Sequence, residues 1–308
     1  MCLLSIIIVS YNTRELLRAC LSSIVETLAS DVPYEIIVVD NASVDGSVEM
    51  LREFPQVKLV ESEKNLGFAA ANNRGLALSS GRYLLLLNSD TVLRKGALQE
   101  LVDFLETHPG VGVVTGRLMY GDGSFQHSAF SFPTLWMTFF DFFPLNHRFV
   151  DSRLNGRYPK GAYAAPFEID HPLGACMMVR REVLEQVGPL SEEYFMYCEE
   201  IDWCLRIKAA GWRIYCQPKA EIVHYGGQST RQFWADMFIE LHRSRFRLFR
   251  RHYSPLFQLA AKAIVSLGLA RETMRAWWHF RRGSMSRSEY EDRMRAHRGV
   301  FLALKEKV

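Results

Sequence analysis

The first 115 residues alternate between two hydrophobic patterns. Short, continuous apolar runs predict buried strands at 6–10, 35–40, 57–60, 83–87 and 111–115. Apolar residues at helical spacing between these runs predict helices at 16–28, 45–54, 67–79 and 96–107. Strands that are apolar throughout and are joined by helices are typical of a mostly parallel central sheet covered by helices. The pattern therefore predicts an α/β fold that binds its ligand at the carboxyl ends of the strands.

The later part of the chain is less regular. Residues 116–168 are rich in glycine, proline and aromatic residues, and we expect the phenylalanine-rich segment 130–149 to be mainly core, with a lid or a groove as alternatives. Further patterns predict a strand at 171–180, a helix at 199–210 and strands at 212–217 and 221–224. A long basic and aromatic helical tract follows residue 230. We therefore expect a main domain at 1–230 and a helical extension at 231–308.

The balance of basic and acidic residues also changes near residue 230. Residues 231–308 contain 17 Lys and Arg against 7 Asp and Glu, whereas residues 1–230 contain 20 against 27. The total formal charge of only +3 argues against a dedicated nucleic-acid-binding protein. Six scattered cysteines without a CxxC pair predict a reduced, cytoplasmic protein. Because Gln258 and Lys262 interrupt the apolar stretch at 255–270, no transmembrane helix is expected.

Two of the predicted strands end in a carboxylate. Asp40 follows the second strand, and Asp90 follows the fourth within the run Asn88-Ser89-Asp90. A carboxylate is costly to bury unless it meets a cation or hydrogen-bond donors. Asp90 is interpreted either as a divalent-metal ligand that also holds a diphosphate or as a turn residue that caps the next helix. Asp40 can accept hydrogen bonds from a ribose or a base, whereas Asp45 is expected to be a helix cap.

A second acidic group opens one of the later predicted helices. This group has three carboxylates, which is more than N-terminal capping requires, and they are Glu199, Glu200 and Asp202. Helical spacing places Glu199 and Asp202 on one face with Arg206, where they predict a row of ion pairs. Glu200 shares another face with Trp203, an arrangement that suits a general base beside an aromatic sugar platform.

His224 ends a predicted strand. A single histidine is usually structural, but a neutral imidazole at a strand end is also a common metal ligand. No GxGxxG follows the first strand, where Tyr11-Asn12-Thr13 stands instead, and no GxxxxGK[ST] occurs. The sequence therefore disfavours a dinucleotide-dependent dehydrogenase and a P-loop enzyme.

Seven stretches resemble, in order, the motifs of glycosyltransferase family 2, whose members have the GT-A fold. They are residues 5–13, 37–47, 65–75, 83–91, 174–181, 194–206 and 220–230. Within the family the chain is most similar to the bacterial rhamnosyltransferase branch. The resemblance implies a GT-A catalytic domain at 1–230, with a nucleotide-sugar half at 1–115 and an acceptor half at 116–230, followed by the basic extension.

The resemblance also implies which residues bind the nucleotide-sugar donor. Asp40 would contact the nucleotide base, and the backbone from Ser10 to Asn12 would line the same site. Three further positions would face the donor, namely Asn65, Gly67 and Asn72.

The resemblance implies a divalent ion, Mg²⁺ or Mn²⁺, on the donor diphosphate. Asp90 would bind this ion and His224 would complete the metal site. Asn88 stands where relatives have a further carboxylate, so this chain keeps only one of the usual two, and Asn88 is expected to contact the donor. Glu200 stands where the family usually has the aspartate that acts as catalytic base, and Glu199 and Asp202 are the alternatives.

The activity implied by the resemblance is inverting transfer of a sugar, rhamnose from dTDP-rhamnose, to a glycan acceptor in cell-wall or O-antigen polysaccharide synthesis. The basic aromatic tail is predicted either to contact an anionic membrane at the inner face of the plasma membrane, where the acceptor would be lipid-linked, or to pack on the main domain. A nucleotidyltransferase is disfavoured because no glycine-rich phosphate loop follows the first strand. A non-catalytic nucleotide-sugar scaffold or sensor is the alternative, since it would need Asp40 and Asp90 but no base.

Overall fold

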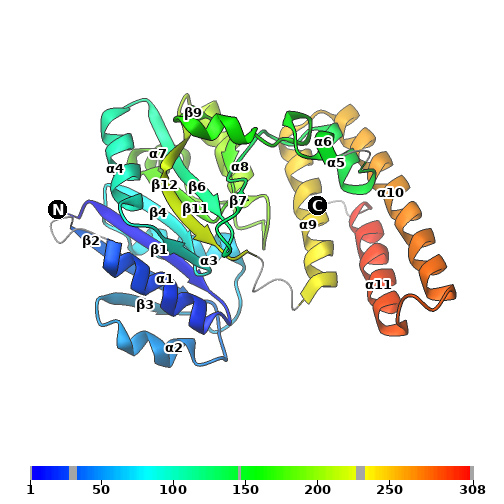
Figure 1. Ribbon diagram of the computed structural model, residues 1–308, viewed down its shortest axis with the longest axis horizontal. Helices are drawn as coiled ribbons and strands as arrows, with labels where there is room; N and C mark the ends of the chain where they lie inside the picture. The colour runs from blue at the N-terminus through cyan, green and yellow to red at the C-terminus, as the bar shows by residue number, and fades with distance from the viewer. Residues whose placement is uncertain (1, 28–32, 145–146, 227–232, 306–308) are drawn as a thin grey trace. The chain divides into compact units, whose positions relative to one another are not determined.

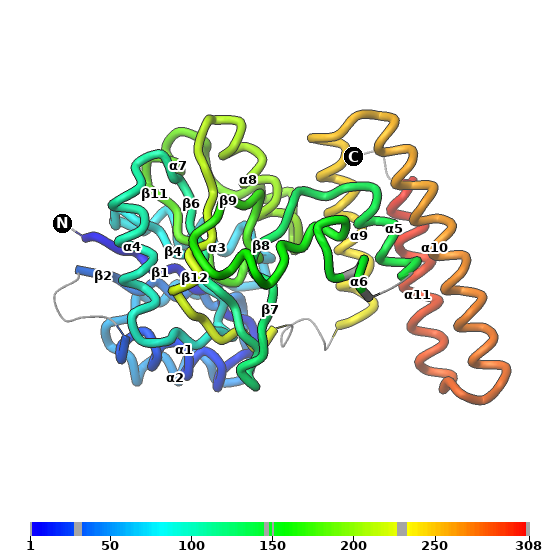
Figure 2. Tube along the Cα trace, turned by 45° about the horizontal axis from the view of Figure 1, so that its top comes forward, coloured from blue at the N-terminus to red at the C-terminus, as the bar shows by residue number. Residues whose placement is uncertain are grey.

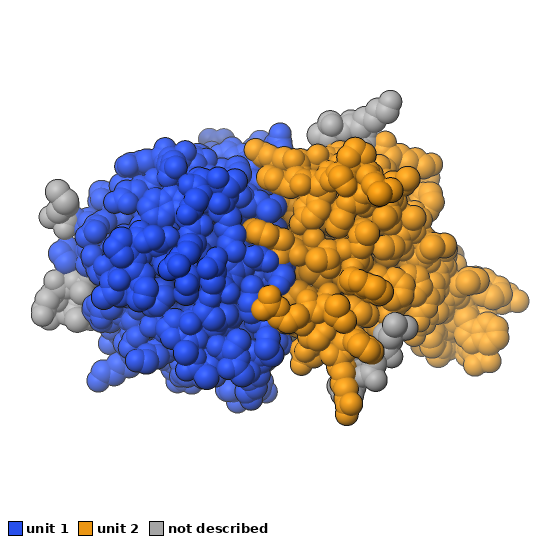
Figure 3. All heavy atoms as spheres, turned by 90° about the horizontal axis from the view of Figure 1, so that it is seen from above, with its two compact units in different colours: residues 1–131, 158–195, 199–229 blue, residues 132–157, 196–198, 230–308 orange. Residues whose placement is uncertain are grey.

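A computed structural model describes residues 2–27, 33–144, 147–226 and 233–305 of the chain (Figure 1). The chain forms two compact units that interleave along the sequence (Figure 3). The sheet unit comprises residues 1–131, 158–195 and 199–229, and the helical unit comprises 132–157, 196–198 and 230–308. The predicted boundary at 230, the last motif residues 227–230 and the predicted helix end at 28 lie outside the described residues.

The sheet unit contains the strands β1–β12. They are β1 (Leu4–Ser10), β2 (Tyr34–Asp40), β3 (Val57–Glu61), β4 (Tyr83–Asn88), β5 (Thr91–Leu93), β6 (Val111–Met119), β7 (Phe125–Gln126), β8 (Ala129–Phe130), β9 (Phe167–Glu168), β10 (His171–Pro172), β11 (Cys176–Arg180) and β12 (Arg213–His224). Its helices are α1 (Arg14–Thr27), α2 (Ser47–Met50), η1 (Leu51–Glu53), α3 (Phe68–Leu78), α4 (Ala97–Thr107), η3 (Lys160–Ala164), α7 (Arg181–Val187) and α8 (Glu199–Ala209).

The main sheet has the strand order β3-β2-β1-β4-β11-β6-β12-β5. The first four strands are parallel, as the mainly apolar sequences of β1, β2 and β4 predict. Beyond β4 the sheet is mixed, because β11 runs antiparallel to both β4 and β6, whereas β6 and β12 are parallel. The predicted α/β class is confirmed.

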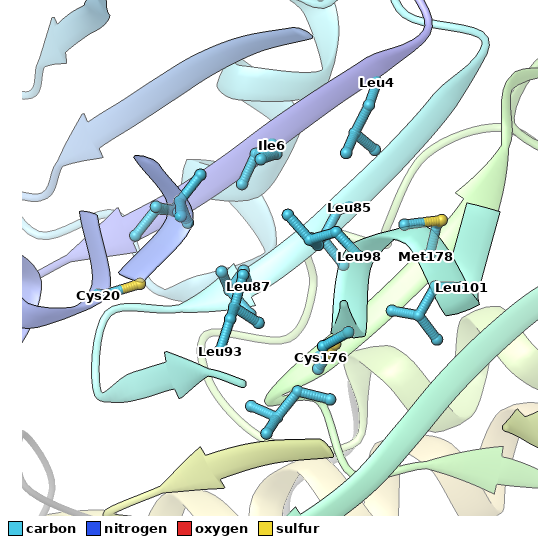
Figure 4. Packing of buried hydrophobic residues seen from close by; sticks show 14 of the residues in the cluster. Leu4, Ile6, Cys20, Leu85, Leu87, Leu93, Leu98, Leu101, Cys176 and Met178 are labelled. Atoms are coloured by element: carbon cyan, nitrogen blue, oxygen red, sulfur yellow. The ribbon is translucent and has the colours of Figure 1, made fainter. Parts of the chain in front are cut away.

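Alternation of side chains along β1 explains why both faces of the sheet are covered. Ile6 and Ile8 belong to the large buried cluster that also contains side chains of α1 and α4 (Figure 4). Ile7 points to the opposite face, where Gly75 of α3 lies so close that a Cβ would collide with the isoleucine. Since neighbouring residues of a strand point to opposite faces, a strand covered on both sides is mainly apolar along its whole length.

Some predicted elements differ from the observed ones. The strand expected at 171–180 is two strands, β10 and β11, which belong to different sheets. The strands expected at 212–217 and 221–224 are one strand, β12, with a register shift between Gln217 and Glu221. Such an irregularity bends a strand without ending it. Several short elements were not predicted, among them β5, α5 and α7.

The helical unit contains α5 (Leu135–Phe142), α6 (His147–Val150), η2 (Arg153–Asn155), α9 (Trp234–His252), α10 (Pro255–Arg281) and α11 (Arg287–Ala303). The long helices α9, α10 and α11 pack against one another within this unit (Figure 2). Phe142 of α5 is buried with Phe246 and Phe249 of α9 in its core. Part of the phenylalanine-rich segment is therefore core, although Trp136 and Phe149 are exposed. None of the helices within the described residues is long and apolar enough to cross a bilayer.

All six cysteines lie in the described part of the chain and are free thiols. Five of them are buried, namely Cys20, Cys176, Cys198, Cys204 and Cys216, and Cys2 is partly exposed. Burial raises the pKa of Cys20, Cys176 and Cys216 to about 12.

Candidate active site

Strand register brings three of the predicted site residues to one edge of the sheet. Ser10 at the end of β1 pairs with Asp40 at the end of β2. On the other side of β1, Val9 pairs with Asn88 at the end of β4. The carboxyl ends of β2, β1 and β4 are therefore adjacent, as expected for a ligand site in a parallel sheet.

Asp40 is buried, with one carboxylate oxygen in use and one that lacks a hydrogen-bond partner. Its Oδ2 accepts a 2.9 Å hydrogen bond from the N–H of Ser43, whereas Oδ1 is buried and unpaired. A buried acceptor without a donor is costly, so this oxygen is available for a donor group on a ligand.

The loops beside Asp40 are held by hydrogen bonds of their own. Asn12 has a left-handed backbone with φ of 52°, and its Oδ1 accepts from the N–H of Val44. Ser10 shares a hydrogen bond with Thr13, and Thr13 shares another with Ser89. Ser10 and Asn12 therefore fix the shape of this edge. Asp45 accepts from the N–H groups of both Ser47 and Arg14, at the starts of α2 and α1, but the N-cap of α2 is Gly46, so the expected N-cap position is off by one residue.

Asn41 is a residue that the sequence analysis missed. Its Nδ2 donates to Asn65 Oδ1 at 2.8 Å, and its Oδ1 accepts from the N–H of Leu66. Asn65 also accepts from the N–H of Gly67, so Asn41 and Asn65 together shape the loop before α3. Asn72 is buried inside α3, where its Nδ2 donates to the Phe68 carbonyl. The position of Asn41 directly after Asp40 was the available signal.

Asp90 and His224 face each other at the junction of β5 and β12. The antiparallel register of these strands pairs His224 with Thr91, and Asp90 Oδ1 lies 3.4 Å from His224 Nε2. On the other side of the ring, His224 Nδ1 lies 3.2 Å from the Oε1 of Gln126, a second residue not foreseen from sequence. Asp90 precedes a strand, so its interpretation as a helix cap is wrong.

These residues fit a divalent cation. The tautomer of His224 that is protonated at Nδ1 would donate to Gln126 and leave Nε2 able to bind a cation together with Asp90 Oδ1. Asn88 Oδ1, two residues before Asp90, is buried and has no hydrogen-bond partner. A hard cation that binds a diphosphate needs only one or two protein carboxylates. No group of three or more His, Cys, Asp or Glu within the described ranges forms a closed metal site.

The acidic cluster opens α8, and its members differ sharply. Asp202 is fully buried and forms a 2.9 Å ion pair with Arg206, which confirms that part of the predicted row. Glu199 is also buried. Trp203 is fully buried and donates to the Gly188 carbonyl, so its interpretation as a sugar platform is wrong. The side chain is core because α8 packs that face inward.

Glu200 has the environment of a general base. Its Oε2 is buried without a hydrogen-bond partner, and burial raises the pKa of Glu200 to about 7, although the backbone N–H groups of Glu200 and Ile201 act to lower it. The side chain lies against Gly174, where an added Cβ would contact it. The next residue, Ala175, accepts the N–H of Asn88, so Glu200 lies near the end of β4.

The family comparison agrees with this arrangement. The glycosyl transferase family 2 model matches residues 5–188, and the chain belongs to that family. It is therefore a glycosyltransferase.

Among curated relatives, the chain is 28% identical over 264 residues to the N-acetylglucosaminyl-diphospho-decaprenol L-rhamnosyltransferase of Mycobacterium tuberculosis, covering 79% of this chain and 82% of the relative. It is 27% identical over 259 residues to the rhamnosyltransferase WbbL of Escherichia coli, covering 80% of this chain and 92% of that one. The predicted resemblance to the rhamnosyltransferase branch is confirmed.

A solved structure with a similar fold is the mannosyltransferase PcManGT from Pyrobaculum calidifontis, in complex with GDP-Man and Mn²⁺. Its TM-score is 0.58 at 17% identity, and the match covers 97% of this chain and 86% of that one. GalNAc-T7 with UDP, GalNAc and Mn²⁺ also has a TM-score of 0.58, at 16% identity, with 72% of this chain and 43% of that chain covered. These likenesses confirm the predicted fold.

Proposed function

We propose that the protein transfers rhamnose from dTDP-rhamnose to a lipid-linked glycan acceptor by inverting, single-displacement transfer. The activities named for the two rhamnosyltransferases support the choice of sugar, and the decaprenol-linked acceptor named for the first supports the choice of acceptor. Cell-surface polysaccharide synthesis at the inner face of the plasma membrane is the setting that fits such an acceptor.

The donor would lie across the carboxyl ends of β2, β1 and β4. Asp40 Oδ1, which is buried and unpaired, is the acceptor for an N–H or O–H of the nucleoside. The loop shaped by Asn65 and Gly67, and the backbone from Ser10 to Asn12, would complete the nucleotide half of the site.

Asp90 and His224 are the residues that would hold Mg²⁺ or Mn²⁺, with Gln126 fixing the orientation of the imidazole. A divalent ion held there supplies positive charge that stabilises the leaving nucleoside diphosphate. The orphaned Asn88 Oδ1 lies two residues before Asp90 and is a further oxygen ligand or a hydrogen-bond acceptor for the donor.

Glu200 would take the proton of the attacking acceptor hydroxyl. The observation that carries the proposal is its buried, unpaired Oε2 together with a pKa raised to about 7, since a base works best when its pKa is near the working pH. Asp202 is committed to Arg206, which makes it a positioning residue for α8 rather than the base. A scaffold or sensor would have no use for the proton acceptor at Glu200.

The test combines donor binding and transfer in one set of variants. We expect Glu200→Gln to keep the donor-induced thermal shift and to lose transfer by about 10²–10⁴-fold. We expect Asp90→Ala to lose the part of the shift that depends on Mg²⁺ or Mn²⁺ and is abolished by EDTA. A donor at about 100 times its Kd adds about 2.7 kcal/mol of stability, so a screen of dTDP-, UDP- and GDP-sugars also identifies the nucleotide.

Matched variants make the result specific. Glu199→Gln tests the neighbouring carboxylate, and Asp103→Ala on the exposed face of α4 controls for loss of a carboxylate elsewhere. Normal transfer by Glu200→Gln would refute its role as base. A shift with UDP- or GDP-sugars and none with dTDP-rhamnose would refute the proposed donor.

A further inference from the structure

Helix α10 is apolar on two opposite faces. One face is buried in the core of the helical unit, where α10 packs against α5 and α11. The side chains and the glycine on this face are Ala261, Val265, Gly268, Leu269 and Ala276. Gly268 is so close to the ring of Phe142 that a Cβ would overlap it, which shows how tightly this face is filled.

The other face of α10 carries large apolar side chains in solvent. Their exposed fractions lie between 48% and 76%, and they are Leu256, Leu259, Leu267, Met274, Trp277 and Trp278. At about 100° per residue these positions fall within one sector about 100° wide, about half a turn away from the buried face. An apolar stripe of this length is unusual on the surface of a water-soluble unit and marks an interaction site. We refer to these six residues as the α10 stripe.

Cations accompany the carboxyl-terminal end of the α10 stripe. Arg281 lies over the ring of Trp277 at 5.7 Å, and Arg282 lies over that of Trp278 at 4.2 Å. Arg275 is also exposed beside the stripe. Exposed tryptophans stacked with arginines combine an apolar ring, a polar N–H and a fixed positive charge, the combination that suits the boundary between lipid tails and headgroups. The whole of 231–308 carries 17 basic against 7 acidic residues.

We propose that the α10 stripe docks on an anionic phospholipid surface, with α10 lying in the plane of the membrane. The stripe would enter the boundary between headgroups and acyl chains, and Arg275, Arg281 and Arg282 would contact lipid phosphates. No helix in the described part of the chain meets the requirement for a spanning segment, so the helix lies on the bilayer rather than across it.

Charge favours a membrane over a second copy of this chain as the occupant. In a two-fold symmetric contact the same patch meets itself, so two copies of one basic surface would be brought together and would repel each other. An anionic bilayer offers opposite charge around the same apolar stripe. The inference deepens the proposed function, because it assigns the contact that would bring the enzyme to a lipid-linked acceptor. Only the purpose of the docking rests on the proposed function; the docking itself does not.

The test is co-sedimentation of the full chain with vesicles of phosphatidylcholine alone and of phosphatidylcholine mixed with phosphatidylglycerol. We expect the wild type to bind the mixed vesicles and the triple variant Leu259→Gln/Leu267→Gln/Met274→Gln to bind at least about tenfold more weakly, equivalent to about 1.4 kcal/mol. The variant Arg275→Gln/Arg282→Gln should lose affinity for the anionic vesicles and show a weaker dependence on salt.

Leu78→Gln/Leu154→Gln is the matched control, because both leucines are exposed but lie outside α10. Thermal unfolding of all variants without ligand shows that they are folded and keeps the docking test separate from the test of sugar transfer. Equal binding by the wild type and the triple variant, or no binding of the wild type to mixed vesicles, would overturn the proposal. A concentration-dependent dimer that the triple variant abolishes would overturn it in favour of a second copy.

Discussion

Two carboxylates on one helix show how local surroundings determine the role of a residue. Asp202 has its charge matched by Arg206 at 2.9 Å, whereas the Oε2 of Glu200 is buried without a hydrogen-bond partner. The proton on Glu200 is therefore held more tightly in the folded protein than in the unfolded chain. Such a group destabilises the fold when it ionises, which is a common property of residues that serve chemistry rather than folding.

This difference predicts a pH-dependent stability. The folded pKa of Glu200 is raised to about 7 from 4.5, so the stabilising contribution of its protonated form is present below pH 4.5 and is lost as the pH rises through about 7. Glu200→Gln cannot ionise, so it should match the wild type below pH 4.5 and be more stable by on the order of 2–3 kcal/mol near pH 8.

Thermal or urea unfolding across this pH range measures the difference. Glu185→Gln, on the exposed side of α7, serves as control and should follow the wild type at every pH. A constant gap between Glu200→Gln and the wild type would contradict the raised pKa.

Site residues could be predicted where their position at the end of a strand is enough to place them in the site. Asp40, Asp90 and His224 each follow a strand or end one, so the sheet itself brings them to the ligand edge. The role of Gln126 could not be predicted, because it acts through a side-chain contact with a residue far away in sequence. The sequence places Asn41 beside Asp40 but does not show its hydrogen bond with Asn65. Trp203 was misjudged, since helical spacing shows which residues share a face but not which face is buried.

At the scale of elements, the long periodic segments were predicted well and the short ones were not. α1, α3 and α4 and the first four strands follow from their apolar spacing. β5 has only three residues and is a strand because β12 pairs with it, which no local pattern reveals. Similarly, β10 and β11 are separate strands because they pair in different sheets, which no local pattern reveals.

The start of α3 gives a prediction at this scale. Gly67 has φ of 81° and ψ of 178°, and a Cβ there would collide with the carbonyl of Phe195. Gly188 has nearly the same backbone, with φ of 81° and ψ of 176°, but nothing within 4 Å of an added Cβ. Both alanine variants should lose about 1–3 kcal/mol from backbone strain, and Gly67→Ala should lose more because of the collision.

Urea unfolding of Gly67→Ala and Gly188→Ala separates the two effects. The N–H of Phe68 donates to the Phe195 carbonyl at 2.7 Å, so the same displacement should also weaken donor binding in Gly67→Ala alone. Equal losses of stability in the two variants would show that the loop before α8 moves to accommodate the added Cβ with no loss of free energy of unfolding.

At the scale of the whole molecule, the helical unit is built from three separate stretches of the chain rather than from its carboxyl-terminal part alone. It includes 132–157 and the three residues 196–198, which directly precede α8. Tyr197 and Cys198 both have left-handed backbones, with φ of 69° and 67°, and Ser244 of α9 donates a 2.8 Å hydrogen bond to the Met196 carbonyl. A strained pair of non-glycine residues needs such support from its surroundings.

Ser244→Ala is therefore expected to act on catalysis through this segment. Loss of one hydrogen bond of about 0.5–1.5 kcal/mol should lower kcat by about 2–10-fold while leaving the donor-induced thermal shift unchanged. The measurement is transfer at saturating donor over a range of pH, because a displaced Glu200 also changes the pH profile. Ser266→Ala on α10 is the control, and a Ser244→Ala enzyme with the wild-type profile would count against the connection.

The distribution of thiols makes this enzyme a ready subject for single-site labelling. Of its six cysteines, all in the described residues, five are buried, and three of these have a pKa raised to about 12, so they hold almost no thiolate at neutral pH. A maleimide dye should therefore attach at Cys2 and leave the interior unmodified. One fluorophore per native chain, placed before β1 without any substitution, would report vesicle recruitment and donor binding in real time.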